Sequence, residues 1–180
     1  MKSRFLPWGL VFTVWLIVNV NANANPLTIS AENSELIFSG EHAGMAFEGK
    51  FERWQATLVL PPSIDHKITA TFDLSSAKTG DRTYDSTLPE GDWFDVETHP
   101  QGSFVATTIS ASSNGFWVEG ELTLKGITKS NRFELIGSLE KGFKANIVVN
   151  RLDFAIGLES DPDADWVSKD IQLQMSIPSQ

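Results

Sequence analysis

The side chains best suited to catalysis are few in this sequence and lie far apart. The three histidines, His42, His66 and His99, have no spacing typical of a metal site. The chain has no cysteine, which excludes thiol chemistry, a disulfide framework and a lipid anchor on cysteine. No nucleophile motif such as G-x-S-x-G is present. We therefore predict a protein that is not an enzyme and requires no metal or other cofactor.

His42 lies among residues with a strand pattern. We interpret it as a polar contact near the mouth of a β-barrel, with a role as a ligand-binding group as the alternative. Four acids stand at every second position further on: Glu159, Asp161, Asp163 and Asp165. Oxygen ligands so spaced can hold calcium, but the stretch lacks the central glycine and final bidentate acid of an EF-hand loop. We predict a solvated turn here.

Residues 79–104 interrupt an otherwise regular pattern. Five residues there break any long element: Gly80, Pro89, Gly91, Pro100 and Gly102. Yet Leu88, Trp93 and Phe94 are large apolar side chains that a solvated loop does not need. A connection this long is usually functional or folded over something. We predict an irregular cap with a short helix around residues 88–94, lying across one end of a β-structure; a long loop pinned to the core is the alternative.

The first 24 residues have the order of a secretory signal peptide. Lys2 and Arg4 precede an apolar run, and Ala22 and Ala24 form a small-x-small cleavage site. We expect cleavage, an uncleaved anchor being the alternative, and a mature domain over residues 25–180. That domain is more acidic than the whole chain of net charge −9, because the leader is basic. Such charge argues against nucleic acid and anionic membrane surfaces as partners. No second long apolar run is present, so we expect no stable membrane insertion after cleavage.

Apolar and polar residues alternate over many short runs, and this alternation predicts the fold class. Ile68, Ala70, Phe72 and Leu74 share one phase, and similar runs follow near residues 116–124, 143–149 and 167–177. A period of two is typical of antiparallel sheet with one buried face. We predict an all-β barrel or sandwich of about eight strands. They lie near residues 27–31, 35–42, 45–60, 67–74, 103–110, 115–125, 130–139 and 142–150, and one near 167–177 makes a ninth.

The predicted strand at residues 45–60 changes phase midway. Phe47, Gly49 and Phe51 share one phase, whereas Trp54 and Ala56 share the other. Such a change predicts a bulge or a sharp bend, as at a barrel corner. The chain also holds 12 phenylalanines and 6 tryptophans. In a small barrel they either fill the interior or line an elongated apolar cavity, and the residues alone leave both options open.

Several stretches, in order, resemble the YceI-like family. They are Ser34-Glu35-Leu36-Ile37-Phe38, His42-Ala43-Gly44, Gly49-Lys50-Phe51, Ser76-Ala77-Lys78-Thr79-Gly80, Asp92-Trp93-Phe94-Asp95, His99-Pro100, Ser103-Phe104, residues 120–129 (GELTLKGITK), and Asn150-Arg151-Leu152-Asp153-Phe154 with Gly157. The resemblance spans nearly all of residues 25–180. It implies an extended, eight-stranded, lipocalin-like antiparallel barrel with a short helix or loop cap, exported to the bacterial periplasm. It also implies an apolar tunnel for a polyisoprenoid chain, such as that of a ubiquinone-like quinone or another polyprenyl lipid.

An apolar tunnel needs a long, dry lining, and the inward strand phase together with the cap supplies the candidates. The predicted lining residues are Phe38, Phe47, Phe51, Phe72, Leu88, Trp93, Phe94, Phe104, Leu122 and Ile147. The leading hypothesis is a periplasmic carrier or reservoir for an isoprenoid lipid. An enzyme acting on a lipid or acidic small molecule through His42, Asp92 or Asp95 is one alternative, and a structural β-domain with a filled core is another. The oligomeric state stays open, a dimer being one option.

Overall fold

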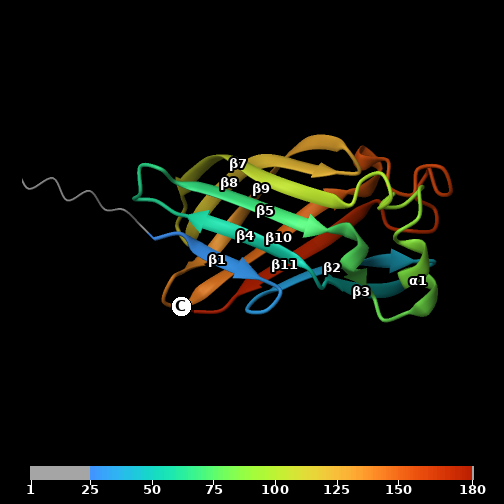
Figure 1. Cartoon of the computed structure of the whole chain (residues 1–180), viewed down its shortest axis with the longest axis horizontal. Helices are drawn as coiled ribbons and strands as arrows, with labels where there is room; N and C mark the ends of the chain where they lie inside the picture. The colour runs from blue at the N-terminus through green and yellow to red at the C-terminus, as the bar shows by residue number, and fades with distance from the viewer. Residues whose placement is uncertain (1–24, 180) are drawn as a thin grey trace, which may run out of the picture.

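The computed structural model in Figure 1 describes residues 25–179. The proposed leader, residues 1–24, lies outside the described residues. One antiparallel sheet of eleven strands dominates the described chain and curls round a single core. This confirms the predicted all-β, antiparallel, barrel-like class, although the sheet has more strands than the eight or nine expected.

The elements run in chain order from β1 to β11. The strands are β1 (Leu27–Ser30), β2 (Glu35–His42), β3 (Met45–Phe51), β4 (Trp54–Val59), β5 (Lys67–Asp73), β6 (Ala77–Lys78), β7 (Gln101–Ala111), β8 (Gly115–Leu124), β9 (Ile127–Ser138), β10 (Gly142–Asn150) and β11 (Asp170–Ile177). One α-helix, α1 (Arg82–Thr87), and two short 3₁₀ helices, η1 (Leu74–Ser76) and η2 (Arg151–Phe154), complete the described elements. Neighbouring strands follow the order β1-β4-β5-β7-β8-β9-β10-β11-β2-β3-β6.

A sharp corner between β3 and β4 joins the two ends of this sheet. β4 is second from one end of the strand order and β3 is second from the other. Phe51 and Trp54 are both buried, whereas Glu52 and Arg53 between them are exposed. The two exposed residues shift the side-chain phase, so both strands point apolar residues into the same core. The predicted bend at residues 45–60 is confirmed, and it splits one predicted strand into two.

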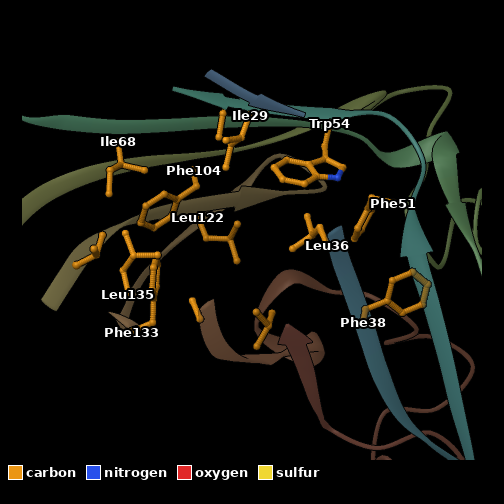
Figure 2. Close-up of a cluster of buried hydrophobic side chains, with 14 of the residues drawn as sticks. Ile29, Leu36, Phe38, Phe51, Trp54, Ile68, Phe104, Leu122, Phe133 and Leu135 are labelled. Atoms are coloured by element: carbon orange, nitrogen blue, oxygen red, sulfur yellow. The ribbon is translucent and has the colours of Figure 1, made fainter. Parts of the chain in front are cut away.

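The core is built from the inward phase of the strands. In β8, for example, Val118, Leu122 and Leu124 are buried and alternate with exposed or half-buried residues. Figure 2 shows one of them, Leu122, in the same buried cluster as the side chains of Phe104, Phe133 and Trp54 from other strands. Burial of apolar side chains on one face of each strand drives the sheet to curl, because a flat sheet would leave that face in water.

Helix α1 lies earlier in the cap than predicted. It covers Arg82–Thr87, and residues 88–94 form hydrogen-bonded turns instead. Asp81 starts the helix, since its carboxylate accepts hydrogen bonds from the Thr83 and Tyr84 backbone N–H groups. Pro89 follows the C-cap residue Leu88 and has no N–H with which to extend the helix. The prediction of a helix at residues 88–94 was therefore wrong, because the N-cap at Asp81 and the proline at position 89 confine the helix to the preceding residues.

Glycine 120 tests the close packing inside the barrel. A Cβ atom there would lie 2.5 Å from the Phe104 ring and 2.5 Å from the Val105 carbonyl oxygen. We expect Gly120→Ala to lower the free energy of unfolding by about 1–3 kcal/mol through overpacking. Gly91→Ala is the matched control, because nothing lies within 4 Å of its added Cβ. Thermal unfolding measures both, and equal melting temperatures for the two variants contradict this packing.

Candidate functional site

Three apolar chambers lie in series inside the barrel. The mouth chamber has a volume of about 230 Å³, the middle chamber about 90 Å³ and the deep chamber about 60 Å³. The mouth and middle chambers share five lining residues: Phe38, Phe47, Leu88, Trp93 and Val167. The middle and deep chambers share Leu36, Phe72, Leu122 and Leu173. Because the mouth and deep chambers share none, the three form one elongated path rather than a single round cavity.

The structure brings the ten predicted lining residues onto this path. Eight of them line the middle chamber: Phe38, Phe47, Phe51, Phe72, Leu88, Trp93, Phe94 and Leu122. The other two, Phe104 and Ile147, line the deep chamber. Their contact with a ligand stays a prediction, but their common position follows from the inward strand phase.

Several other lining residues escaped the prediction. They are chiefly aliphatic: Leu36, Leu124, Val149, Ile156, Val167, Ile171 and Leu173. Leu36 and Leu124 share the inward phase with Phe38 and Leu122, so alternation alone could have found them. Ile156 lies outside the named strands and helices, where no periodicity marks the inward side. Val167 belongs to the alternating run predicted at residues 167–177, although β11 itself begins only at Asp170.

Aromatic rings pack against one another around the middle chamber. Phe51 packs against three other rings, with centroids 5.4 Å from Phe38, 6.1 Å from Phe72 and 6.2 Å from Phe94. These tilted arrangements are favourable for aromatic pairs. Phe51, at the β3 end of the corner, therefore connects the barrel wall to the cap.

The cap residues Leu88, Trp93 and Phe94 do not share one environment. Phe94 is buried in the core, whereas Leu88 and Trp93 are half-buried and line both the mouth and middle chambers. Leu88 and Trp93 thus form a partition between the two chambers. The sequence prediction that cap residues cover one end of the β-structure agrees with this placement.

Arg151, in η2, is a buried charged residue that the sequence analysis did not select. Its guanidinium donates hydrogen bonds to backbone carbonyls and to one carboxylate oxygen of Asp161, at 2.6 Å. The carbonyl acceptors are Ile156, Gly157, Asp161, Val167 and Ser168. The guanidinium also lies 5.9 Å from the Trp93 ring centroid, within cation–π range. Its donors are therefore committed to the protein, although Arg151 lines the middle chamber.

Asp161 corrects the prediction of a solvated acidic turn. Only 5% of this residue is exposed, whereas Glu159 and Asp163 are solvent-exposed. Burial alone would raise the pKa of Asp161. Backbone N–H donors from Val167, Trp166 and Asp165, together with the charge of Arg151, outweigh burial and hold that pKa below its ordinary value. Buried backbone donors need acceptors, and this carboxylate supplies them.

Two further charged side chains, Asp92 and Lys125, fasten the cap to the same loop through hydrogen bonds. Asp92 accepts hydrogen bonds from the Glu159 and Ser160 N–H groups and from the Ser160 hydroxyl. Lys125 donates to the backbone carbonyls of Asp92 and Ala155. Burial would raise the pKa of Asp92, but these hydrogen bonds hold it below its ordinary value. The carboxylate of Asp92, which the enzyme hypothesis names as a catalytic group, thus accepts hydrogen bonds that hold the structure together.

His42 makes the polar contact predicted for it. Its Nδ1 atom shares a 2.6 Å hydrogen bond with the Tyr84 hydroxyl, and both residues line the mouth chamber. His66 bonds its own loop through the Ser63 carbonyl, and His99 lies 4.0 Å from Asp95. Within residues 25–179, no group of three or more histidine or acidic side chains is arranged to hold a metal ion.

The sequence matches one family along almost all of its described length. Residues 27–178 match the model of the YceI-like domain. The chain belongs to the YceI-like family. The YceI protein of Salmonella agona is 26% identical over 192 residues, covering 98% of this chain and 97% of that protein.

Two solved structures share the fold. BcnA of Burkholderia cenocepacia aligns with a TM-score of 0.73 at 24% identity, covering 82% of this chain and 96% of that one. A polyisoprenoid binding domain from Saccharophagus degradans, implicated in plant cell wall breakdown, aligns with a TM-score of 0.63 at 12% identity, covering 86% and 98%. Among the described residues of this YceI-like chain, no helix is both long and apolar enough to cross a membrane.

The buried pair predicts a large stability effect. We expect Arg151→Met to lower the free energy of unfolding by about 3–5 kcal/mol, because Asp161 would stay buried without its partner. The matched control is Arg53→Met, which breaks the largely exposed ion pair between Arg53 and Asp73. An exposed pair contributes only about 0–1 kcal/mol. Urea unfolding compares the two, and similar losses refute a special role for Arg151.

The direction of the Asp161 shift also fixes a pH dependence. A carboxyl whose pKa is lower folded than unfolded stabilises the protein above its unfolded pKa, and the effect disappears as pH falls through the folded pKa. We expect the melting temperature of the native protein to decrease once the pH is lowered beyond about 4, the ordinary pKa of an aspartate. Asp161→Asn should melt lower at neutral pH but lose less on acidification. Parallel pH curves for the two proteins would show that Asp161 is not responsible.

Proposed function

We propose that this YceI-like chain is a periplasmic binding protein that holds an isoprenoid lipid, of the ubiquinone-like or polyprenyl kind, in its barrel interior. Its role is that of carrier or reservoir, without catalysis. Export rests on the leader pattern of residues 1–24 in the sequence. Family membership and the shared fold with a polyisoprenoid binding domain support the choice of ligand.

The observation that carries this proposal is the elongated, apolar path of three chambers. Each CH₂ group removed from water contributes roughly 0.8 kcal/mol. A branched hydrocarbon chain can therefore bind along Phe38, Phe72 and Leu122 without any charged contact. A compact polar metabolite would find few hydrogen-bond partners in the middle and deep chambers.

The chamber volumes imply movement of the lining. The middle and deep chambers, about 90 and 60 Å³, are each smaller than the roughly 150 Å³ cavity that holds a benzene molecule. To admit a chain of several isoprene units, the side chains between the chambers must therefore change rotamer. Leu88 and Trp93 are suited to this, because they are half-buried and belong to the cap rather than to a strand.

The polar groups near the path support binding rather than turnover. Asp92 is held by Glu159 and Ser160, and neither Asp92 nor Asp95 lines any of the three chambers. His42 does line the mouth, where its Nδ1 is paired with Tyr84. A general base needs a carboxylate or imidazole within hydrogen-bond reach of the substrate. Among the described residues that line the three chambers, His42 is the only one with such a group.

Mass spectrometry of lipids extracted from purified native protein tests the proposal. A prenyl chain in the extract, in stoichiometric amount, supports it. An empty extract, with no uptake of added prenyl lipid, refutes it in favour of a structural domain with a filled core. Turnover of a lipid that is lost in His42→Ala refutes the absence of catalysis.

Trp93 tests the role of the cap. We expect Trp93→Ala to release a bound prenyl lipid several-fold faster, because the partition between mouth and middle chambers is removed. Truncation of a buried aromatic side chain in a rigid core lowers the free energy of unfolding by about 3–5 kcal/mol. We expect a smaller loss for Trp93→Ala, because Trp93 is half-buried. Stopped-flow lipid transfer and thermal melting measure the two effects.

The matched comparison is Phe94→Ala, which removes the buried neighbouring ring and should cost the full core value. If Trp93→Ala unfolds the protein as readily as Phe94→Ala, the residue belongs to the core and not to a lid. If it changes neither stability nor exchange, the partition has no function.

A further inference from the structure

The mouth chamber differs from the two inner chambers in its chemistry. Its lining includes an imidazole, a phenol and three threonines: His42, Tyr84, Thr79, Thr83 and Thr87. These groups stand beside apolar residues that continue into the middle chamber. A mainly apolar path that carries several polar groups at one end matches a lipid with a small polar head and a hydrocarbon tail.

We propose that the mouth chamber is the headgroup subsite, and that it selects an uncharged headgroup carrying a carbonyl or hydroxyl oxygen. This inference rests on the proposed function, since it assigns the polar end of the same lipid. Its tail would then extend past Leu88 and Trp93 toward the middle chamber.

Size favours the mouth over the deep end for the headgroup. The mouth chamber, about 230 Å³, exceeds the roughly 150 Å³ that accommodates a six-membered ring, whereas the deep chamber is about 60 Å³. The deep end offers a competing position, because the buried Trp54 Nε1 and Asn131 Oδ1 atoms have no hydrogen-bond partner among the described residues. The experiment below therefore includes Trp54.

Charge decides which headgroups the mouth accepts. None of its lining residues is a lysine, arginine, aspartate or glutamate. The cation of the adjoining chamber, Arg151, already donates to five carbonyls and to Asp161. A phosphate or diphosphate would thus lose water without gaining a counter-charge, which is strongly unfavourable. An uncharged oxygen loses far less.

The Tyr84–His42 pair can serve either a donor or an acceptor on the headgroup. A phenol both donates and accepts hydrogen bonds. In a neutral imidazole one ring nitrogen donates and the other accepts. If His42 Nδ1 carries the proton and donates to Tyr84, the phenolic hydrogen is free for a carbonyl oxygen. With the other tautomer, Tyr84 donates to His42 and its lone pairs can accept from a hydroxyl.

Helix α1 holds Tyr84 in place before any ligand arrives. Asp81 caps the helix, and Asp85 accepts hydrogen bonds from the Thr79 N–H and hydroxyl at 2.7 and 3.0 Å. The Tyr84 ring also packs 6.3 Å from Phe47 and 5.4 Å from His42, measured between centroids. A preorganised donor loses little entropy on binding, so it can discriminate between ligands.

The test uses three probes with one C15 prenyl tail: farnesol, farnesyl diphosphate and the headless hydrocarbon farnesene. Equilibrium dialysis, with ligand quantified by mass spectrometry, gives the Kd of each for the native full chain and its variants. We expect Tyr84→Phe to weaken farnesol binding about fivefold, the value of one hydrogen bond, and to leave farnesene binding unchanged. Ser86→Ala, an exposed change on the same helix, should alter neither.

A gain of function tests the charge rule. Thr87 lines the mouth at the C-terminal end of α1, where a cation is compatible with the helix dipole. We expect Thr87→Lys to bind farnesyl diphosphate at least about tenfold more tightly than the native chain does, as for a charge-assisted hydrogen bond.

The outcomes separate the two proposals. If the native chain binds none of the three probes, the proposed function itself is overturned. Tight farnesene and farnesol binding that Tyr84→Phe does not change overturns only the headgroup subsite. If Trp54→Phe weakens the binding of farnesol but not that of farnesene, the headgroup lies at the deep end. That result also overturns the headgroup subsite at the mouth. Unchanged diphosphate binding in Thr87→Lys refutes the charge rule.

Discussion

The buried guanidinium of Arg151 is the interaction on which the rest of the mouth end depends. Its donors satisfy carbonyl groups spread over residues 156–168, a stretch with little regular secondary structure of its own. Backbone groups buried without partners are costly, so the loop can only fold in this way if the arginine is present. Asp161 then neutralises the arginine and accepts the remaining N–H groups.

This charged centre also positions the apolar path. Trp93 lies over the guanidinium, and the Gly157 N–H donates to the Asp92 carbonyl, so cap and loop are fixed to one another. Lys125, at the end of β8, adds a third connection through Ala155. The partition between the mouth and middle chambers thus rests on a rigid charged base, although the residues that form it are only half-buried.

In this barrel the hydrophobic core and the candidate binding site share many side chains. Phe51 and Phe94 count among the buried core and also line the middle chamber. Substitutions there change stability and ligand affinity together, so they say little about function. The residues that separate the two effects lie at the cap and the mouth, where Trp93 and Tyr84 are half-buried.

The sequence by itself determined the sheet, the inward phase of its side chains and ten of the residues that line the chambers, because a period of two is set locally by the strand backbone. The change of phase within residues 45–60 also predicted a bulge or a sharp bend, and the structure has its corner there, at residues 52 and 53. Only the tertiary structure decided that Asp161 is buried, although its local sequence is typical of a solvated turn. The reason is that its partner, Arg151, lies in η2, outside the acidic stretch. The same holds for the pairing of His42 with Tyr84, residues far apart in the chain. Contacts of this kind leave no local pattern, since they arise only when the sheet curls and brings distant segments together at one end.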